Sequence, residues 1–589
     1  MLEHRHPASI GISTGTGWLP GELVDRTHGT GRGIVVGQCT APPHVLFERV
    51  RLALGGGDLR TLMSMPGAYA VILSSPIEVV LVPDAVGQFP IYYHTCSRKI
   101  VFGTRADLVA AEVNASFDLV SLALEIACPQ AFRVLGTRSA FNRVQQLEPG
   151  TALRINPSGV RVSSVTSLIP GTRRTLDVAA DDLRDVLRTA VSTRIPHGAA
   201  MSTDFSGGID STSLAFLAAH HVDSLAAVTF TQDGAPVEDD LKAAIALAEL
   251  DPTLSHHIVR GSGSHLPYQR ALSGADAPHP SAQHLGPLGL RLSTAVELDS
   301  TVHLGGEGGD HALSAPHGYL VDLARRGDLD TLWRHCAAWA RLRHRSPTTL
   351  FARSLRLAVT TSRRGLLGLA RQLSGRPPGT NSWENRAITI TGQPDCHWLT
   401  PRSRKALAAQ VASAAGTHNG YRDAGDEIAI AQLRSACRGQ QAVRDAAAAQ
   451  GVAAHAPYLD PAVVQICLSV PAWRRADPWS AKPLLRHAMT GLVPDAVFTR
   501  TTKGDYTGTA HLGVRQAIRS LLALFEEPLS ADLGLIEPGP VREAVIRAAQ
   551  GMPTQWAALN QVLAVEIWLR DIIIRRSEGA PYASVHRPT

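Results

Sequence analysis

The first part of the chain alternates short apolar runs with polar turns, a pattern typical of β-strands. The runs lie between residue 31 and about residue 165. They are Gly33–Val36, Ala70–Leu73, Val79–Val82, Ile100–Phe102 and Val160–Val162. Short strands that follow one another at this spacing predict a β-rich sandwich.

Beyond this region the apolar pattern becomes helical. Ile169–Gly171 combines proline with glycine and marks the best boundary. Apolar residues recur at helical spacing between Leu176 and Ile195, and Val228–Phe230 is a strand-like run before a second helical stretch that reaches Ala248. Strands that alternate with helices predict a parallel, doubly wound α/β sheet.

The chain is therefore expected to form an α/β protein of two domains, with residues 1–170 in the first and 171–589 in the second. Within the second domain, residues 410–589 are mostly helical in pattern. Residues 372–395 are rich in proline, glycine, serine and asparagine, which predicts a loop or linker.

The composition is that of a soluble globular protein, with 44% hydrophobic and 18% charged residues among 589. No apolar run reaches membrane-spanning length, and the first residues lack the apolar core of a secretory signal. The 7 cysteines are scattered without a close pair. We therefore expect reduced thiols in a cytoplasmic protein, with neither a zinc site nor a disulfide framework.

The net charge of +6 is modest, but basic residues gather between Arg341 and Arg376. Leucines and a phenylalanine lie between these arginines, which indicates amphipathic helices with a basic face. Such a face is either a solvated surface or a contact surface for an acidic peptide or protein. No nucleic-acid-binding motif accompanies it, so nucleic acid is not an expected partner.

A first glycine run, Ser206–Ser211, follows an apolar segment and precedes the helix-like Thr212–Ala219. Its two glycines allow the backbone N–H groups to approach a pyrophosphate, and the positive end of the helix favours the same anion. Ser206 and Ser211 add hydroxyl donors, while the carboxylate of Asp210 can hold magnesium. The Gly-Lys-Ser/Thr ending of a Walker loop is missing, so cleavage to AMP and pyrophosphate is favoured. An ordinary strand–helix turn is the alternative.

A second glycine run, Gly305–Asp310, follows the apolar segment Thr301–Leu304 about a hundred residues later. Parallel strands bring their carboxyl ends to one edge of a sheet, which is where open α/β sheets bind ligands. Asp210 and Asp310 can then share one magnesium ion. The alternative is a flexible glycine loop with two solvated acids.

The two runs, in this order and at this spacing, resemble the synthetase domain of class II asparagine synthetases and of their relatives, the β-lactam synthetases and lasso peptide cyclases. Further similar motifs lie along nearly the whole chain. They are Pro66–Ala70, Asp84–Tyr93, Phe102–Arg105 and Leu147–Gly150 in the amidotransferase half, and Ala456–Asp460 and Arg500–Gly504 in the synthetase half. The resemblance implies a class II glutamine amidotransferase-like (Ntn) β-rich sandwich followed by an adenine-nucleotide α-hydrolase-like (PP-loop) parallel sheet with a helical C-terminal part.

The amidotransferase half of that family uses a cysteine exposed as the first residue after methionine removal. Here position 2 is leucine, and the first cysteine is Cys39. A thiolate nucleophile with its own amino-terminal base is therefore missing. The first domain is expected to be degenerate and to make no ammonia, so the amine must come with the substrate.

The resemblance implies ATP and Mg²⁺ as cofactors and a reaction in two halves. A carboxylate first attacks the α-phosphorus of ATP, which gives an acyl-adenylate and pyrophosphate, and an amine then displaces AMP. Glu307 is expected to act as the base or to orient the amine, and Lys503 to stabilise developing negative charge. Glu307 can instead anchor its loop, and Lys503 can be a solvated lysine. Lys482 is a weaker candidate for stabilising that charge.

The nucleotide-binding and metal-binding residues are expected along the same motifs. The nucleotide-binding set is Ser206, Gly207, Gly208, Asp210, Ser211, Thr229 and Gly306. Asp210 and Asp310 are the expected metal ligands.

Within the superfamily, the chain looks most similar to lasso peptide cyclases. β-Lactam synthetases place a tyrosine where this chain has Glu307. Stretches shared with the cyclases are Asp233–Asp240, His256–His257, Leu266–Gln269 and Pro278–Pro280. Taken alone, the two histidines indicate a strand edge or a turn rather than ligands. The resemblance implies a ligase that joins an Asp or Glu side chain of a leaderless precursor peptide to the peptide's N-terminal amine, with a leader-binding protein and a leader peptidase as further partners. A β-lactam or other small-molecule amide synthetase, and a silent peptide-binding protein, are the alternatives.

Overall fold

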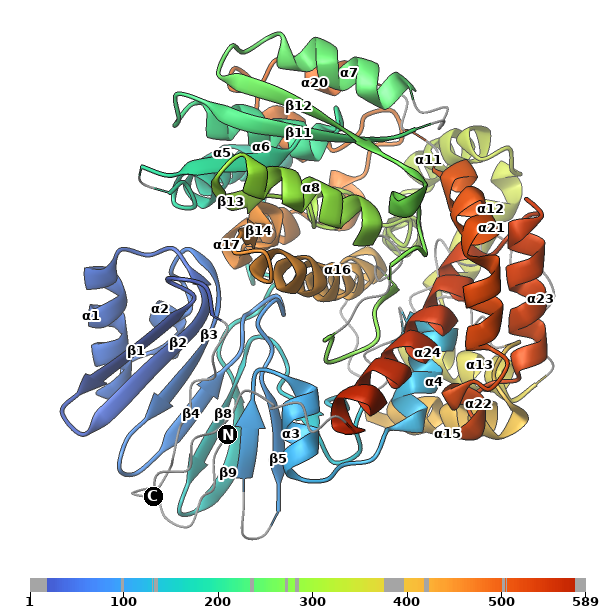
Figure 1. Ribbon diagram of the computed structural model, residues 1–589, viewed down its shortest axis with the longest axis horizontal. Helices are drawn as coiled ribbons and strands as arrows, with labels where there is room; N and C mark the ends of the chain where they lie inside the picture. Colours follow the sequence, from blue (N-terminus) through green and yellow to red (C-terminus); the bar gives the residue numbers. More distant parts are fainter. Residues whose placement is uncertain are drawn as a thin grey trace.

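Figure 1 shows the computed structural model of the chain, with sheets in its N-terminal part and in the middle of the chain and mostly helices toward its C-terminus. The structure describes residues 18–96, 100–129, 131, 136–196, 198–233, 238–270, 274–280, 285–375, 397–417, 423–500, 504 and 506–577. No helix in these ranges combines the length and the apolar character that a membrane crossing requires.

Two antiparallel sheets form the N-terminal part. The larger has the strand order β1-β2-β3-β4-β8-β9 and the smaller β6-β5-β7. Their bounds are β1 Leu23–His28, β2 Gly31–Cys39, β3 Gly67–Ser74, β4 Val79–Val82, β5 Tyr92–Thr95, β6 Ile100–Gly103, β7 Gln145–Gln146, β8 Thr151–Asn156 and β9 Gly159–Ser164.

An apolar layer between these sheets confirms the predicted β-rich sandwich. Side chains of the larger sheet, such as Ile34 and Leu81, pack in one buried cluster with Tyr93 and Phe102 of the smaller sheet. Alternate residues of the larger sheet, such as Val35, face a second cluster that includes helices α1 (Pro43–Leu54) and α2 (Leu59–Leu62). This alternation is the period of two that a strand buried on both faces requires.

A third sheet contains five parallel strands in the order β12-β11-β10-β13-β14, which confirms the predicted parallel α/β sheet. The strands are β10 Ala200–Asp204, β11 Leu225–Gln232, β12 Leu254–Gly261, β13 Ser300–Leu304 and β14 Ala453–His455. His256 and His257 lie on β12, the edge strand, as expected. Strand β10 lies in the middle, with β11 on one side and β13 on the other.

Helices cover both faces of the parallel sheet. Met201 of β10 and Val302 and Leu304 of β13 pack in a cluster with α5 (Leu176–Ser192) and α6 (Ile209–Ala219). The intervening residues of both strands point the other way, toward α8 (Leu285–Glu297), which contacts β11, β12 and β13. Helix α7 (Glu238–Ala248) contacts β11 and β12, and α16 (Ala424–Ala448) contacts β14.

The C-terminal half is mostly helical, as predicted. The longer helices are α10 Tyr319–Arg326, α11 Leu329–Leu342, α12 Pro347–Ala358, α13 Ser362–Ser374, α15 Pro401–Thr417, α16 Ala424–Ala448, α17 Pro461–Ser469, α21 Thr507–Leu524, α23 Pro538–Ala549 and α24 Trp556–Ser577. The shorter helices are α9 Gly309–Leu313, α18 Ala472–Arg475, α19 Pro483–Ala488, α20 Ala496–Thr499 and α22 Leu529–Asp532. Most of the predicted linker, 376–395, lies outside the described residues.

One large core joins the two halves of the chain. Helices α3 (Ala106–Glu112) and α4 (Leu119–Ala127) share a buried apolar cluster with α13, α15, α21, α23 and α24. In Figure 1, α4 lies beside α24 although the two are far apart in the sequence. The boundary predicted at residue 170 falls between β9 and α5. The shared core contains residues from both sides of this position, so the division into two domains stays a prediction.

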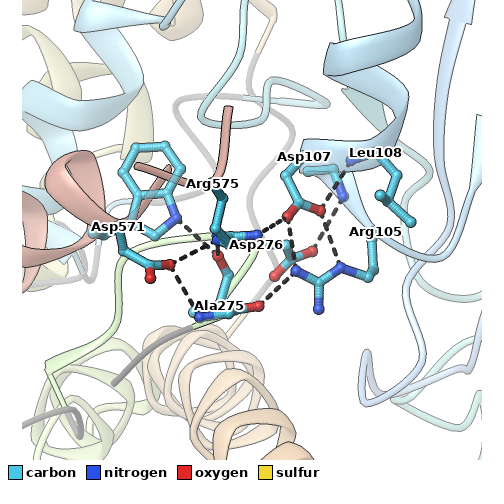
Figure 2. A network of polar contacts seen from close by, with 10 residues as sticks. Arg105, Asp107, Leu108, Ala275, Asp276, Asp571 and Arg575 are labelled. Carbon is cyan, nitrogen blue, oxygen red and sulfur yellow. Dashed lines mark hydrogen bonds and ion pairs between the residues drawn. The ribbon is translucent and has the colours of Figure 1, made fainter. Parts of the chain in front are cut away.

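A polar network reinforces the same junction (Figure 2). Arg575 of α24 donates to Asp107 of α3 at 2.7 Å, and Arg105 pairs with the same carboxylate at 2.7 Å. The buried carboxylate of Asp276 accepts from the backbone N–H of Ala106. The network therefore ties the N-terminal part, the segment around residue 276 and the last helix together.

Candidate active site

The two glycine runs lie side by side, because each follows one of two neighbouring parallel strands. Strand β10 leads into Ser206–Ser211, and β13 leads into Gly305–Asp310. Glycine allows their close approach: a Cβ atom on Gly309 would lie 2.4 Å from Cγ of Asp210, and one on Gly306 would lie 3.1 Å from the backbone nitrogen of Ser211. The expected convergence at one sheet edge is thus present.

The first run forms a loop in which polar groups converge. The hydroxyls of Ser206 and Ser211 lie 2.9 Å apart, and the N–H groups of Ser206 and Gly208 donate to Ser211 and Ser206. Gly207 has φ +71°, and a Cβ there would lie 2.8 Å from the backbone of Ala244. Such a loop at the start of α6 has the donors that a phosphate group needs.

Asp210 and Asp310 meet at the ammonium group of Lys482. The Nζ atom of Lys482 donates to Oδ2 of Asp210 and lies 2.7 Å from Oδ1 of Asp310. Lys482 is buried at the start of α19, with φ +51°. Burial opposes its charge, but the two carboxylates outweigh this effect and raise the pKa of Lys482. The sequence offered this lysine only as a weaker candidate.

The arrangement also fits a divalent cation. Two carboxylates that already converge on one positive charge are hard oxygen ligands of the kind that Mg²⁺ prefers. Among the described residues no group of three or more His, Cys, Asp or Glu side chains gathers in a metal-binding arrangement. Asp210 and Asp310 would therefore hold magnesium together with phosphate oxygens and water, as Mg²⁺ sites commonly do.

Glu307 is the first of the two acidic residues in the second glycine run. Its side chain is accessible to water, yet protein surrounds it closely enough to hinder ionisation. This partial burial, together with the negative charge of Asp204, raises the pKa of Glu307. A carboxylate with a raised pKa is better suited to accept a proton than an ordinary surface acid.

Lys503 lies outside the described residues, but residues on both sides of it are anchored beside the first glycine run. Arg500 pairs with Asp240 of α7 and donates to the carbonyl of Gly207 at 3.3 Å. Tyr506 donates to the same Asp240 carboxylate at 2.6 Å, as does the backbone of Gly504 at 3.3 Å. The role of Lys503 stays a prediction.

Thr229 contacts the residue before the first glycine run rather than the run itself. Its buried hydroxyl donates to the carbonyl of Phe205 and lies 2.7 Å from Nε2 of His256. These contacts hold β11 and β12 to the end of β10. The role of Thr229 in nucleotide binding stays a prediction.

Three further residues contribute to the site: Tyr458 and Leu459, which belong to the predicted motif Ala456–Asp460, and Asp204, which the sequence did not single out. Tyr458 donates to the carbonyl of Asp210 at 3.1 Å, and Leu459 packs where a Cβ on Gly308 would lie, 2.4 Å away. Asp204 is the last residue of β10, and only Phe205 separates it from the first glycine run. Its charge at the end of an otherwise uncharged strand was the available signal.

One comparison with known proteins bears on this geometry. The family model for asparagine synthase matches residues 182–570, well over half of the chain. No curated protein matches. Similar solved structures are a glutamine phosphoribosylpyrophosphate (PRPP) amidotransferase from B. subtilis complexed with ADP and GMP, at 15% identity, and the allosteric regulatory enzyme of purine biosynthesis, at 11% identity.

The structural likenesses are slight. The first match covers 52% of this chain and 59% of the other, the second 50% and 63%, so the chain spans less than two thirds of either, and both TM-scores are 0.16. At such TM-scores neither carries an argument about fold or function. The family model, by contrast, spans both glycine runs and Lys482. The chain belongs to the asparagine synthase family.

Proposed function

We propose that the chain is a lasso peptide cyclase: an AMP-forming macrolactam synthetase that activates an Asp or Glu side chain of a leaderless precursor peptide and joins it to the peptide's N-terminal amine. Membership of the asparagine synthase family indicates an ATP-dependent, amide-forming ligase. The choice of a peptide as substrate goes beyond family membership and is based on the similarity of the motifs to those of the cyclases. A leader-binding protein and a leader peptidase would supply that substrate.

The observation that carries the proposal is the convergence of Asp210, Asp310 and Lys482 beside the first glycine run. Bound magnesium would neutralise charge on the phosphates. The ammonium of Lys482 and the N–H groups of the loop supply positive charge where pyrophosphate would leave. The substrate carboxylate oxygen forms a bond to the α-phosphorus, and the bond from that phosphorus to the bridging oxygen breaks.

In the second half the amine nitrogen bonds to the activated acyl carbon, and AMP leaves with the oxygen that came from the carboxylate. The ammonium must first lose a proton, and a second proton passes from the nitrogen to the departing AMP or to water as the amide forms. Glu307, with its raised pKa, is the proposed acceptor of the first proton. An N-terminal amine has an ordinary pKa of about 8, so a modest base is sufficient near neutral pH.

The N-terminal part is proposed to be a degenerate amidotransferase-like domain. Its first cysteine, Cys39, is largely enclosed, and burial raises the pKa of its thiol to about 11. A thiol of this kind is not an activated nucleophile. The amine therefore has to come from the substrate itself rather than from glutamine.

The test is a turnover experiment with the pure protein, ATP, Mg²⁺ and synthetic candidate peptides. We expect pyrophosphate and AMP to appear together with a peptide product that is lighter by one water. Asp310→Asn should stop pyrophosphate release, whereas Asp330→Asn, an exposed aspartate on α11, should not. ADP as the product would exclude the scheme, and turnover of small amino acids alone would favour a small-molecule amide synthetase.

A further inference from the structure

A chain of four polar side chains runs along the α8 face of the parallel sheet and ends at the active site. Ser202 Oγ of β10 lies 2.9 Å from Nδ1 of His303 on β13. Nε2 of His303 lies 3.2 Å from Oδ1 of Asp204, and Arg291 of α8 donates through Nη1 to the same oxygen at 2.6 Å. Ser202 and His303 are buried, so the chain begins in the sheet and opens toward Arg291.

Asp204 holds the guanidinium of Arg291 at the mouth of the site. Asp204 is the last residue of β10, and only Phe205 separates it from the first glycine run; its Oδ2 atom lies 3.8 Å from where a Cβ on Gly305 would be. Burial disfavours its charge, but Arg291 and His303 lower the pKa of Asp204 to about 2. The carboxylate is thus ionised and fixed, and Arg291 is fixed with it.

Arg291 retains donors that no described residue uses. Its side chain is 27% exposed, and its hydrogen bond to Asp204 occupies only Nη1. The charge of Arg291 opposes the rise in the pKa of Glu307 and also acts on Tyr506, so the guanidinium lies near both residues. An arginine fork anchored on one side and open on the other is suited to a second carboxylate.

Because the site is rich in negative charge, an anionic substrate needs a cation that can bind it. Asp204, Asp210, Glu307 and Asp310 would repel a substrate that arrives as an anion. Among the described cations nearby, Lys482 is paired with Asp210 and Asp310, and Arg500 with Asp240. Arg291 donates to Asp204 through Nη1, and its other terminal nitrogen has no hydrogen bond to the residues that the structure describes.

We propose that Arg291 binds the carboxylate that the enzyme activates, and that Asp204 and His303 are positioning residues that hold the guanidinium in place. The inference rests on the proposed function for the identity of this carboxylate as an Asp or Glu side chain. Beyond the proposed function, the inference names Arg291 as the residue that binds this carboxylate. A planar fork with two parallel donors favours a carboxylate over the neutral amide of Asn or Gln, so Arg291 accounts for selection of the acid.

The test measures binding of two small probes without ATP, by calorimetry or ligand-observed NMR. The probes are N-acetyl-aspartic acid α-amide, which has one carboxylate, and N-acetyl-asparagine α-amide, which has none. Wild-type protein should bind the acid at least about tenfold more tightly than the amide. Arg291→Met should remove this preference and leave binding of the asparagine probe unchanged. Arg260→Met, which removes an exposed arginine from edge strand β12, is the matched control and should retain the preference.

Asp204→Asn and His303→Gln test the positioning role and do not depend on how Arg291→Met folds. Each should reduce the acid preference severalfold while the KM for ATP changes little, a split that general loss of structure would not give. A preference that survives in Arg291→Met, or a wild-type protein without a preference, overturns the inference. If pyrophosphate release with peptides also fails, the proposed function falls with it. If peptide turnover persists, only the role of Arg291 is wrong.

Discussion

At the residue scale, Lys482 occupies the place where a divalent cation would bind, because it contacts both Asp210 and Asp310. We expect Lys482→Met to slow pyrophosphate release by about a hundredfold or more, since a preorganised positive charge is lost. The same change should strengthen binding of Mn²⁺ in the absence of nucleotide, because the competing ammonium is gone. Electron paramagnetic resonance of Mn²⁺ measures this directly. Lys405→Met, on the exposed surface of α15, should alter neither quantity, and unchanged Mn²⁺ binding in Lys482→Met would contradict the prediction.

Glu307 predicts a pH dependence. Its pKa is raised by partial burial and by Asp204, and it acts as a base only when ionised. The rate of amide formation should therefore fall as the pH drops through a pKa above the ordinary glutamate value, and it should level off above that pKa. In Glu307→Gln the rate should be low, and this acidic limb should disappear. Single-turnover measurements from pH 5 to 9 would show it, and an unchanged profile in Glu307→Gln would assign the base elsewhere.

The sequence predicted the residues of this site where chemistry follows a local pattern. The proximity of Asp210 and Asp310 was predictable because each follows a strand and a glycine run, whereas their role as metal ligands stays a prediction. Arg291 was not found, because it belongs to a helix of ordinary composition. Its link to Asp204 arises only when α8 packs on one face of β10, a relation between residues far apart in the chain.

At the element scale, the start of α16 depends on a side chain from another helix. Asp322 of α10 accepts hydrogen bonds from the backbone N–H groups of Ala424 at 2.7 Å and Gly425 at 2.8 Å. Asp322→Ala would leave these buried donors without an acceptor, and we expect a loss of about 2–3 kcal/mol in the free energy of unfolding. Denaturant unfolding measures it. Asp322→Asn, which keeps one acceptor, should lose less, and equal losses would argue against capping.

Helices and strands whose apolar residues recur at a regular spacing were predictable from the sequence, and those without such spacing were not. Strand β4 was predicted with its bounds as observed, and α5 to within a few residues, because apolar spacing alone defines them. Strand β14, by contrast, has only three residues and lies within a region of helical pattern. Its place beside β13 depends on backbone pairing, which no local sequence pattern encodes.

At the scale of the whole molecule, the catalytic part and the N-terminal part hold each other in place. Asp460 follows the segment that contacts both glycine runs, and it accepts from the backbone of Gly67 at 2.9 Å and from Arg194 at 3.0 Å. Gln88 donates to the carbonyl of Leu459 at 2.9 Å. These contacts join residues separated by more than 250 positions, so no pattern along the sequence could have predicted them. They show that the N-terminal part supports the segment that lies against both glycine runs.

This dependence makes the boundary at residue 170 a poor place to divide the protein. A fragment of residues 171–589 contains the whole matched family region, yet it would expose the apolar surfaces of α15 and α24 that α4 now covers, and it would leave Arg575 without Asp107. We expect this fragment to aggregate when expressed alone, because an exposed core surface of this size promotes association. Co-expression with residues 1–170 should restore a soluble complex that elutes at the size of the intact chain and releases pyrophosphate. A monodisperse, active fragment 171–589 would instead show that the shared core is dispensable, and that the first domain is retained for another reason.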